Sequence, residues 1–112
     1  MADICSLAQG RCQPCEGGVP PLSENEIAEL MPSLGDWQRA GNTLVKTYRF
    51  ANYHETMAFV NATAWISHRE DHHPDLAVGY NQCVVSYTTH AIGGLSRNDF
   101  ICAAKIDALL VL

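Results

Sequence analysis

Four of the five histidines of this chain fall within one stretch, residues 68–90, and a carboxylate follows at Asp99. Histidine is the side chain whose unperturbed pKa lies closest to neutrality, so an imidazole can donate or accept a proton at pH 7. A general acid and a general base held together can add a proton to one atom of a substrate and remove one from another. The stretch therefore predicts acid–base catalysis, with its candidate residues being His68, His72, His73, His90 and Asp99.

A metal site is the main competing interpretation of these histidines. His68 and His72 stand four residues apart, which is the spacing of the two histidines in H-E-x-x-H zinc sites. However, Arg69 occupies the position of the glutamate base and places a cation beside the proposed ligand. The adjacent His72 and His73 also do not readily aim at one ion. We therefore expect no metal and no other cofactor.

The cysteines provide a second possible metal pattern. Cys12 and Cys15 have the spacing of half a zinc site, but Cys83 and Cys102 stand alone, so no second pair completes it. We expect residues 1–21 to form an irregular, cysteine-containing lead-in and residues 22–112 to form a single domain.

The composition excludes several classes of partner. A hydrophobic content of 47% over 112 residues favours one folded globule. The net charge of −5 and the seven scattered Lys and Arg residues argue against direct binding of nucleic acid. No apolar run approaches the ~20 residues of a membrane span, and no signal pattern opens the chain. We expect a cytoplasmic protein with no membrane partner.

Three N-capping patterns predict three helices. They begin at Ser23, Asn52 and Ser96, each followed three residues later by an acidic residue. The first helix should stop at Pro32 and the second near Glu70, and the third should run to the chain end. Within the second helix, one buried apolar row is expected at Tyr53, Met57, Val60 and Ala64, flanked by Phe59, Ala62 and Ile66.

Four strands are predicted between these helices. Residues 36–40 and 43–50 flank the turn Gly41-Asn42, and residues 76–80 and 82–89 form a second hairpin. The order is therefore α-β-β-α-β-β-α. Two hairpins joined by a helix indicate an α+β fold, a four-stranded antiparallel sheet with three helices packed on one face.

This fold would bring the candidate residues together. His72 and His73 follow the end of the long helix, since Pro74 disfavours helical geometry at the residue before it. His90 would end the fourth strand, and Asp99 lies in the first turn of the last helix. Because these ends can meet at one rim of the sheet, we expect a cleft lined by imidazoles.

The same residues carry a resemblance to a known family. His68, His72-His73-Pro74, Tyr80, His90 and Asp99, at these spacings, resemble the signature of the pterin-4a-carbinolamine dehydratases (4a-hydroxytetrahydrobiopterin dehydratases). The resemblance covers about residues 22–111. It implies a four-stranded antiparallel sheet with three helices on one side, no metal, and a homo-oligomer that is a dimer or a dimer of dimers.

The resemblance also implies a reaction. A 4a-hydroxytetrahydropterin would lose water to give the quinonoid dihydropterin, in tetrahydrobiopterin recycling. His72 and His90 would flank the reacting carbon as acid and base, His73 would help to hold the pterin, and Asp99 would orient an imidazole. The implied catalytic set is His72, His73, His90 and Asp99, and the implied substrate-binding set is Asp71, His73, Pro74, Thr88, Thr89 and His90.

Two other functions remain open at this point. One is a pterin-binding or transcription-cofactor-like interaction protein, because one animal member of the resembled family also serves as a dimerisation cofactor for a homeodomain transcription factor. The other is the same activity on a molybdopterin-related pterin. The complete histidine set favours an enzyme.

Overall fold

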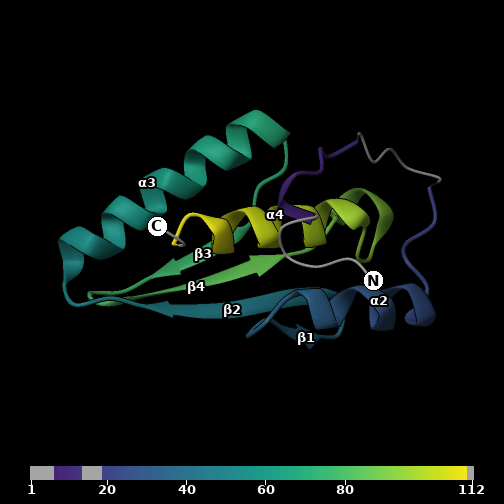
Figure 1. Ribbon diagram of the computed structural model, residues 1–112, viewed down its shortest axis with the longest axis horizontal. Helices are drawn as coiled ribbons and strands as arrows, with labels where there is room; N and C mark the ends of the chain where they lie inside the picture. The colour runs from purple at the N-terminus through teal and green to yellow at the C-terminus, as the bar shows by residue number, and fades with distance from the viewer. Residues whose placement is uncertain (1–6, 14–18, 111–112) are drawn as a thin grey trace.

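The computed structural model describes residues 7–13 and 19–110 (Figure 1). It confirms the predicted order α-β-β-α-β-β-α. The helices are α2 (Glu24–Leu30), α3 (Tyr53–Glu70) and α4 (Arg97–Ala108), and the strands are β1 (Gln38–Ala40), β2 (Thr43–Arg49), β3 (Asp75–Val78) and β4 (Gln82–Tyr87). Two short 3-10 helices, η1 (Met31–Ser33) and η2 (His90–Ile92), follow α2 and precede α4.

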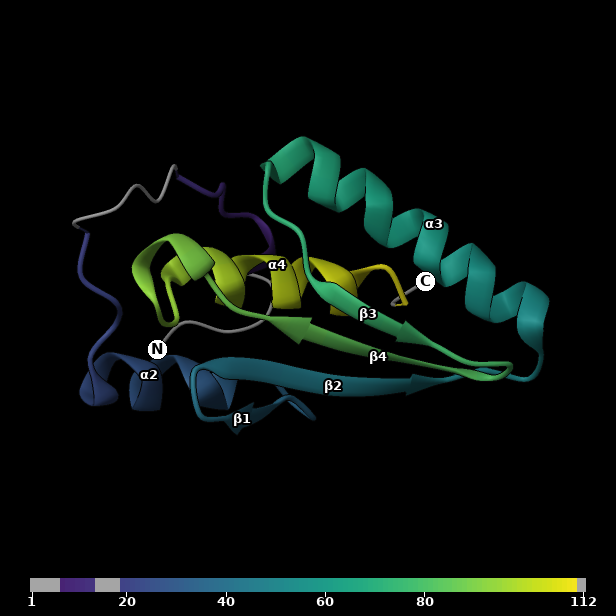
Figure 2. The ribbon, with the colours of Figure 1, turned by 180° about the vertical axis from the view of Figure 1, so that it is seen from behind.

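The four strands form one antiparallel sheet in the order β1-β2-β4-β3. The two hairpins meet along β2 and β4, which pair from Leu44 with Tyr87 to Arg49 with Gln82. Helices α3 and α4 cover one face of the sheet, and α2 lies beside the β1–β2 end, as seen from both sides (Figures 1 and 2). Among the described residues, none of the helices is both long and apolar enough to cross a membrane.

Helix α4 is the central buried element. Phe100, Ile101 and Ala104 are buried in the core cluster that also contains residues of β2 and β4. Near its end, buried Asp107 accepts hydrogen bonds from the Trp37 indole at 3.0 Å and the Lys46 ammonium at 2.8 Å, and from the Tyr48 hydroxyl. These contacts fix α4 over the sheet, because each partner comes from β2 or the segment leading to β1.

The buried face of α3 differs from the predicted one. The structure buries Thr56, Phe59, Thr63, Ile66 and Glu70. By contrast, Tyr53 is 47% exposed and Ala64 is exposed, so the prediction was wrong at both ends of the expected row. Met57 and Val60, between them, are half-buried. The reason is that polar residues of α3 find partners inside the fold, and apolarity alone therefore does not identify the face. The Thr56 hydroxyl, for example, lies 3.0 Å from the carbonyl oxygen of Tyr80.

The described part of the N-terminal stretch packs on the domain. Leu7 is only 1% exposed and belongs to the core, and the Lys105 ammonium of α4 donates to the carbonyl oxygen of Ala8 at 2.6 Å. Cys12 is described, whereas Cys15, the other half of the possible zinc pair, lies outside the described residues.

Candidate active site

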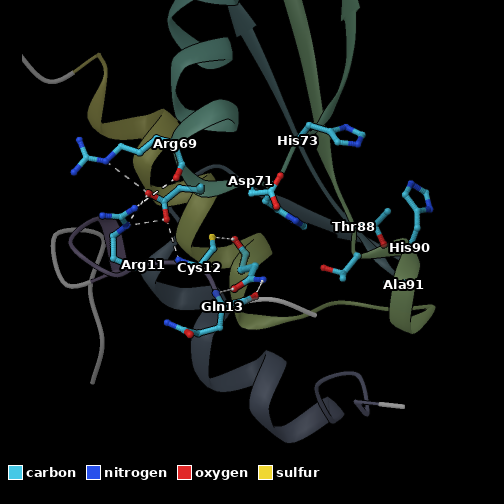
Figure 3. Close-up of a pocket in the computed structure, with 13 residues that line it drawn as sticks. Arg11, Cys12, Gln13, Arg69, Asp71, His73, Thr88, His90 and Ala91 are labelled. Carbon is cyan, nitrogen blue, oxygen red and sulfur yellow. Dashed lines mark hydrogen bonds and ion pairs between the residues drawn. The ribbon is translucent and has the colours of Figure 1, made fainter. Parts of the chain in front are cut away.

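A pocket of about 520 Å³ lies where the end of α3, the end of β4 and the start of α4 meet (Figure 3). Its volume is within the range of sites that bind small molecules. The pocket is lined by side chains from these elements and from the N-terminal stretch, namely Arg11, Cys12, Gln13, Arg69, Glu70, Asp71, His72, His73, Thr88, Thr89, His90, Ala91 and Asn98.

The end of α3 places His72 and His73 at the pocket. Asp71 takes the left-handed conformation, with φ 51° and ψ 43°, and ends the helix there. A short polar side chain tolerates this conformation better than most. The backbone N–H groups of Asp71 and His72 both donate to the carbonyl oxygen of Ser67, which satisfies the last turn. The chain therefore leaves the helix axis immediately before the two histidines.

His72 is held between a carboxylate and an aromatic ring. Its Nε2 lies 2.6 Å from Oδ1 of Asp99, whose side chain is fully buried, and only 13% of the His72 side chain is exposed. The His72 ring also stacks on Tyr87 at 5.7 Å between centroids, with 9° between the planes. An ionised carboxylate only accepts hydrogen bonds, so Nε2 of His72 is the donor. Nδ1 is then the ring nitrogen that can exchange a proton with another group.

Asp99 is itself fixed by hydrogen bonds to its second oxygen. Oδ2 accepts from the Thr89 hydroxyl at 2.8 Å and from the backbone N–H of Ser96 at 2.9 Å. Because the Thr89 proton is directed to Asp99, the Ser96 hydroxyl, 2.7 Å from that of Thr89, is the donor between the two. The first turn of α4 and the end of β4 thus set the position of the carboxylate, and the carboxylate sets the orientation of His72.

Tyr87 forms an apolar wall behind His72. It is fully buried in β4. Burial, reinforced by the nearby side chains of Cys102, Cys12 and Asp99, raises the pKa of Tyr87 far above its ordinary value. The phenol therefore stays neutral at physiological pH, and it serves as a stacking surface for the imidazole.

His73 and His90 are the exposed imidazoles of the site. In Figure 3 they lie on the same side of the pocket, with Arg11 and Cys12 on the other. The Nδ1 atom of His73 lies 3.3 Å from the carbonyl oxygen of Pro74, which can only accept, so Nδ1 donates and Nε2 is left for other contacts. His90 begins η2 and does not end β4, since β4 stops at Tyr87.

The structure brings most of the predicted site residues to this pocket. Asp71, His72, His73, Thr88, Thr89 and His90 all line it. Asp99 lies beneath the lining, in contact with His72, and Pro74 contributes its carbonyl group to His73. His68 does not belong to the lining. It is exposed on α3, where its ring lies 5.9 Å from that of exposed Trp65. Within residues 7–13 and 19–110, no group of three His, Cys, Asp or Glu residues is arranged to hold a metal ion.

Several residues of the site were not predicted. They are Arg11, Cys12, Gln13, Arg69, Glu70, Ala91 and Asn98 in the lining and Tyr87 behind His72. Asn98 stands beside the predicted Asp99 in a first helical turn, which was an available signal. No spacing pattern links residues 11–13 to a helix end almost sixty positions away, so only the fold shows this proximity.

The sequence of the chain matches a known protein family. Residues 20–109 match the family described as Pterin 4 alpha carbinolamine dehydratase. The chain is 63% identical over 112 residues to a protein of Nitrosomonas eutropha, covering 99% of both chains, and 66% identical over 106 residues to one of Nitrosospira multiformis, covering 95% of this chain and 94% of the relative. Both relatives are named provisionally as pterin-4-alpha-carbinolamine dehydratases.

A solved structure agrees with the fold. The crystal structure of a transcriptional coactivator/pterin dehydratase from Brucella melitensis superposes with a TM-score of 0.76 at 26% identity. The match covers 80% of this chain and 97% of that one.

Proposed function

Because the chain belongs to the pterin 4 alpha carbinolamine dehydratase family, we propose that it removes water from a 4a-hydroxytetrahydropterin by histidine acid–base catalysis. The observation that supports this most strongly is the convergence of three imidazoles on one pocket, with one of them tied to a buried carboxylate. The family match and the names of the relatives favour this enzyme over an interaction protein.

The proposed reaction needs two proton transfers and no oxidant. A proton is delivered to the 4a-hydroxyl group, the carbon–oxygen bond breaks, and water leaves. A second proton is removed from the ring nitrogen on the same carbon, whose electron pair forms the carbon–nitrogen double bond of the quinonoid dihydropterin. Acid–base help of this kind typically contributes about 10² to 10⁴ in rate.

We assign the acid to His72 and the base to His90. The Asp99 carboxylate beside His72 offsets the positive charge of an imidazolium, so a His72 that carries both ring protons can give one to the leaving hydroxyl. His90 is exposed and lines the same pocket, where a neutral imidazole can accept the proton of the ring nitrogen. His73 would hold the pterin, since its orientation is fixed by the Pro74 carbonyl group.

The polar lining supports a heterocyclic substrate. Asp71 provides a carboxylate at the pocket, and Thr88 provides a hydroxyl oxygen whose proton is donated to the carbonyl oxygen of Asn42 at 2.6 Å, so both can accept hydrogen bonds from the amino and N–H groups of a pterin ring. We place the reaction in tetrahydrobiopterin recycling, with a molybdopterin-related carbinolamine as the alternative substrate.

The experiment that tests this function is a direct assay. A 4a-hydroxytetrahydropterin is generated in solution, and formation of the quinonoid dihydropterin is followed by absorbance with and without the protein. We expect the protein to accelerate dehydration well above the uncatalysed rate. Binding of the pterin with no acceleration would instead identify a pterin-binding protein and overturn the proposal.

A further inference from the structure

The pocket wall opposite His73 and His90 is built by residues 11–13, which we call the strap (Figure 3). The strap lies before the region that matches the family, which begins at residue 20. It crosses from the end of α3, where Glu70 stands two residues before His72, to the start of α4, where Asn98 directly precedes Asp99. Its contacts therefore bear on the pair at the centre of the site.

The first tie of the strap is to Glu70, the last residue of α3. The backbone N–H of Cys12 donates to Oε1 of Glu70 at 2.9 Å, and the Arg11 guanidinium lies 3.1 Å from Oε2. Burial acts to raise the pKa of Glu70, but the Cys12 N–H and the charges of Lys105 and Arg11 outweigh it, so this pKa lies below its ordinary value. A carboxylate side chain only 1% exposed is thus kept charged largely by the strap.

The second tie is to Asn98, which directly precedes Asp99. The backbone N–H of Gln13 donates to Oδ1 of Asn98 at 2.9 Å, and Nδ2 of Asn98 donates to the carbonyl oxygen of Gln13 at 2.5 Å. The side-chain amide thus pairs with a backbone amide through two hydrogen bonds, which fixes orientation as well as distance. Asn98 is itself 6% exposed, so water does not compete freely for these bonds.

A third contact places the strap against α4. The Cys12 thiol lies 3.5 Å from the sulfur of buried Cys102 and 3.7 Å from the carbonyl oxygen of Asn98. The side chain between the two hydrogen-bonded ties is therefore packed on α4, the helix that carries Asp99.

We propose that the strap is a positioning element, with Glu70 and Asn98 as its positioning residues, and that it holds the ends of α3 and α4 so that the His72–Asp99 hydrogen bond and the substrate wall are maintained. The assignment to substrate turnover rests on the proposed dehydratase function. The effect on the His72–Asp99 bond does not depend on that function. A misplacement of about 1 Å in a site can cost about 100-fold in rate, so a bridge of this kind has a measurable effect.

The test compares two variants with a control. Asn98→Ala removes both hydrogen bonds to Gln13 and should lower kcat/KM for dehydration between about 10- and 100-fold, with a change in the shape of the pH–rate profile. Arg49→Ala is the matched control, since it removes an exposed hydrogen bond to Gln82, at the opposite end of β4 from the pocket, and should leave both unchanged. Glu70→Gln keeps an oxygen that can accept from Cys12 and should lose less activity than Glu70→Ala.

A spectroscopic readout separates this proposal from the dehydratase function. The Nε2 proton of His72 should give a downfield proton resonance in the wild type and in Arg49→Ala, and the resonance should shift or broaden in Asn98→Ala and Glu70→Ala. An unchanged His72 resonance and an unchanged kcat/KM in the folded strap variants would overturn the proposed positioning role. If one of the two alanine variants does not fold, the other and Glu70→Gln carry the test. If the wild-type protein shows no dehydratase activity but the His72 resonance is altered in the strap variants, the positioning role of the strap is supported and only the proposed function is overturned.

Discussion

The Nε2 atom of His72 lies 2.6 Å from Oδ1 of Asp99, although the first residue follows α3 and the second belongs to the first turn of α4. The contact is anchored from the sheet as well, because Thr89, just beyond β4, donates to the other carboxylate oxygen. Three separate parts of the chain thus fix one imidazole. A ring held in this way needs little reorganisation to exchange a proton with a bound substrate.

Asp99→Asn tests the anchoring directly. An amide has one acceptor oxygen, whereas Asp99 accepts from three groups, His72, Thr89 and Ser96. At least one buried partner is left unsatisfied, so we expect a loss of about 1–3 kcal/mol in unfolding free energy. The rate of dehydration should fall by at least about 10-fold, because His72 loses its charge partner. Chemical denaturation and the dehydration assay measure the two effects.

Asp36→Asn is the control for this variant, since Asp36 is exposed and does not line the pocket. It should change neither quantity. Equal activity in Asp99→Asn and Asp36→Asn would mean that the carboxylate only caps α4.

Tyr87 should act through its ring and not through its hydroxyl. Tyr87→Phe keeps the surface that stacks on His72 and should retain most of the activity. Tyr87→Ala removes a fully buried ring and should cost about 3–5 kcal/mol of stability along with activity. Thermal unfolding and kcat of the two variants make the comparison. A large loss of kcat in a stable Tyr87→Phe would instead assign a role to the hydroxyl.

Glu70 should make stability depend on pH in the acid range. Its pKa is lowered in the folded protein, from an ordinary value of 4.5. The unfolded state therefore binds its proton first as the pH falls, and the stabilisation is complete above about pH 4.5 and lost as the pH falls through the lower native pKa. In Glu70→Gln this part of the acid destabilisation should be absent. The unfolding free energy of both proteins is measured in urea between pH 3 and 6. Curves that run parallel over this pH range would exclude the effect.

Self-association is expected from the faces that the chain leaves uncovered. Helices α3 and α4 lie on one side of the sheet, and β3 forms an edge whose Val78 is 43% exposed, with Tyr80 beyond it 66% exposed. Small domains usually cover such edges. We predict the mass of a dimer or a dimer of dimers by light scattering at micromolar concentration. A monomeric mass under these conditions would contradict the prediction.

The fold was largely accessible from the sequence because its signals are local. The caps at Ser23, Asn52 and Ser96 and the Gly41-Asn42 turn depend on neighbouring residues, and the structure confirms the elements they delimit. The buried face of α3 was not accessible in the same way. Thr56 and Glu70 are buried where partners from distant segments satisfy them, and hydrophobic periodicity does not register such partners.

The candidate site shows the same division. His72 and His73 follow from residue type and from the predicted end of α3, and His90 follows from residue type although it begins η2 and does not end β4. The contributions of residues 11–13 and Tyr87 depend on tertiary packing. Cys12, for example, suggested half of a metal site, and in the structure its backbone N–H binds Glu70.

The most direct test of the account is the rate of dehydration of a 4a-hydroxytetrahydropterin by His72→Ala and His90→Ala, with His54→Ala as the matched control. His54 is an exposed histidine in the first turn of α3, outside the pocket. We predict that His54→Ala keeps the wild-type rate, and that each of the other two variants loses between about 10² and 10⁴ in kcat while it stays folded. His72→Ala should also melt at a lower temperature, because it leaves Oδ1 of the buried Asp99 carboxylate without its partner. Near-wild-type rates in both His72→Ala and His90→Ala would contradict the assignment of acid and base to this pair.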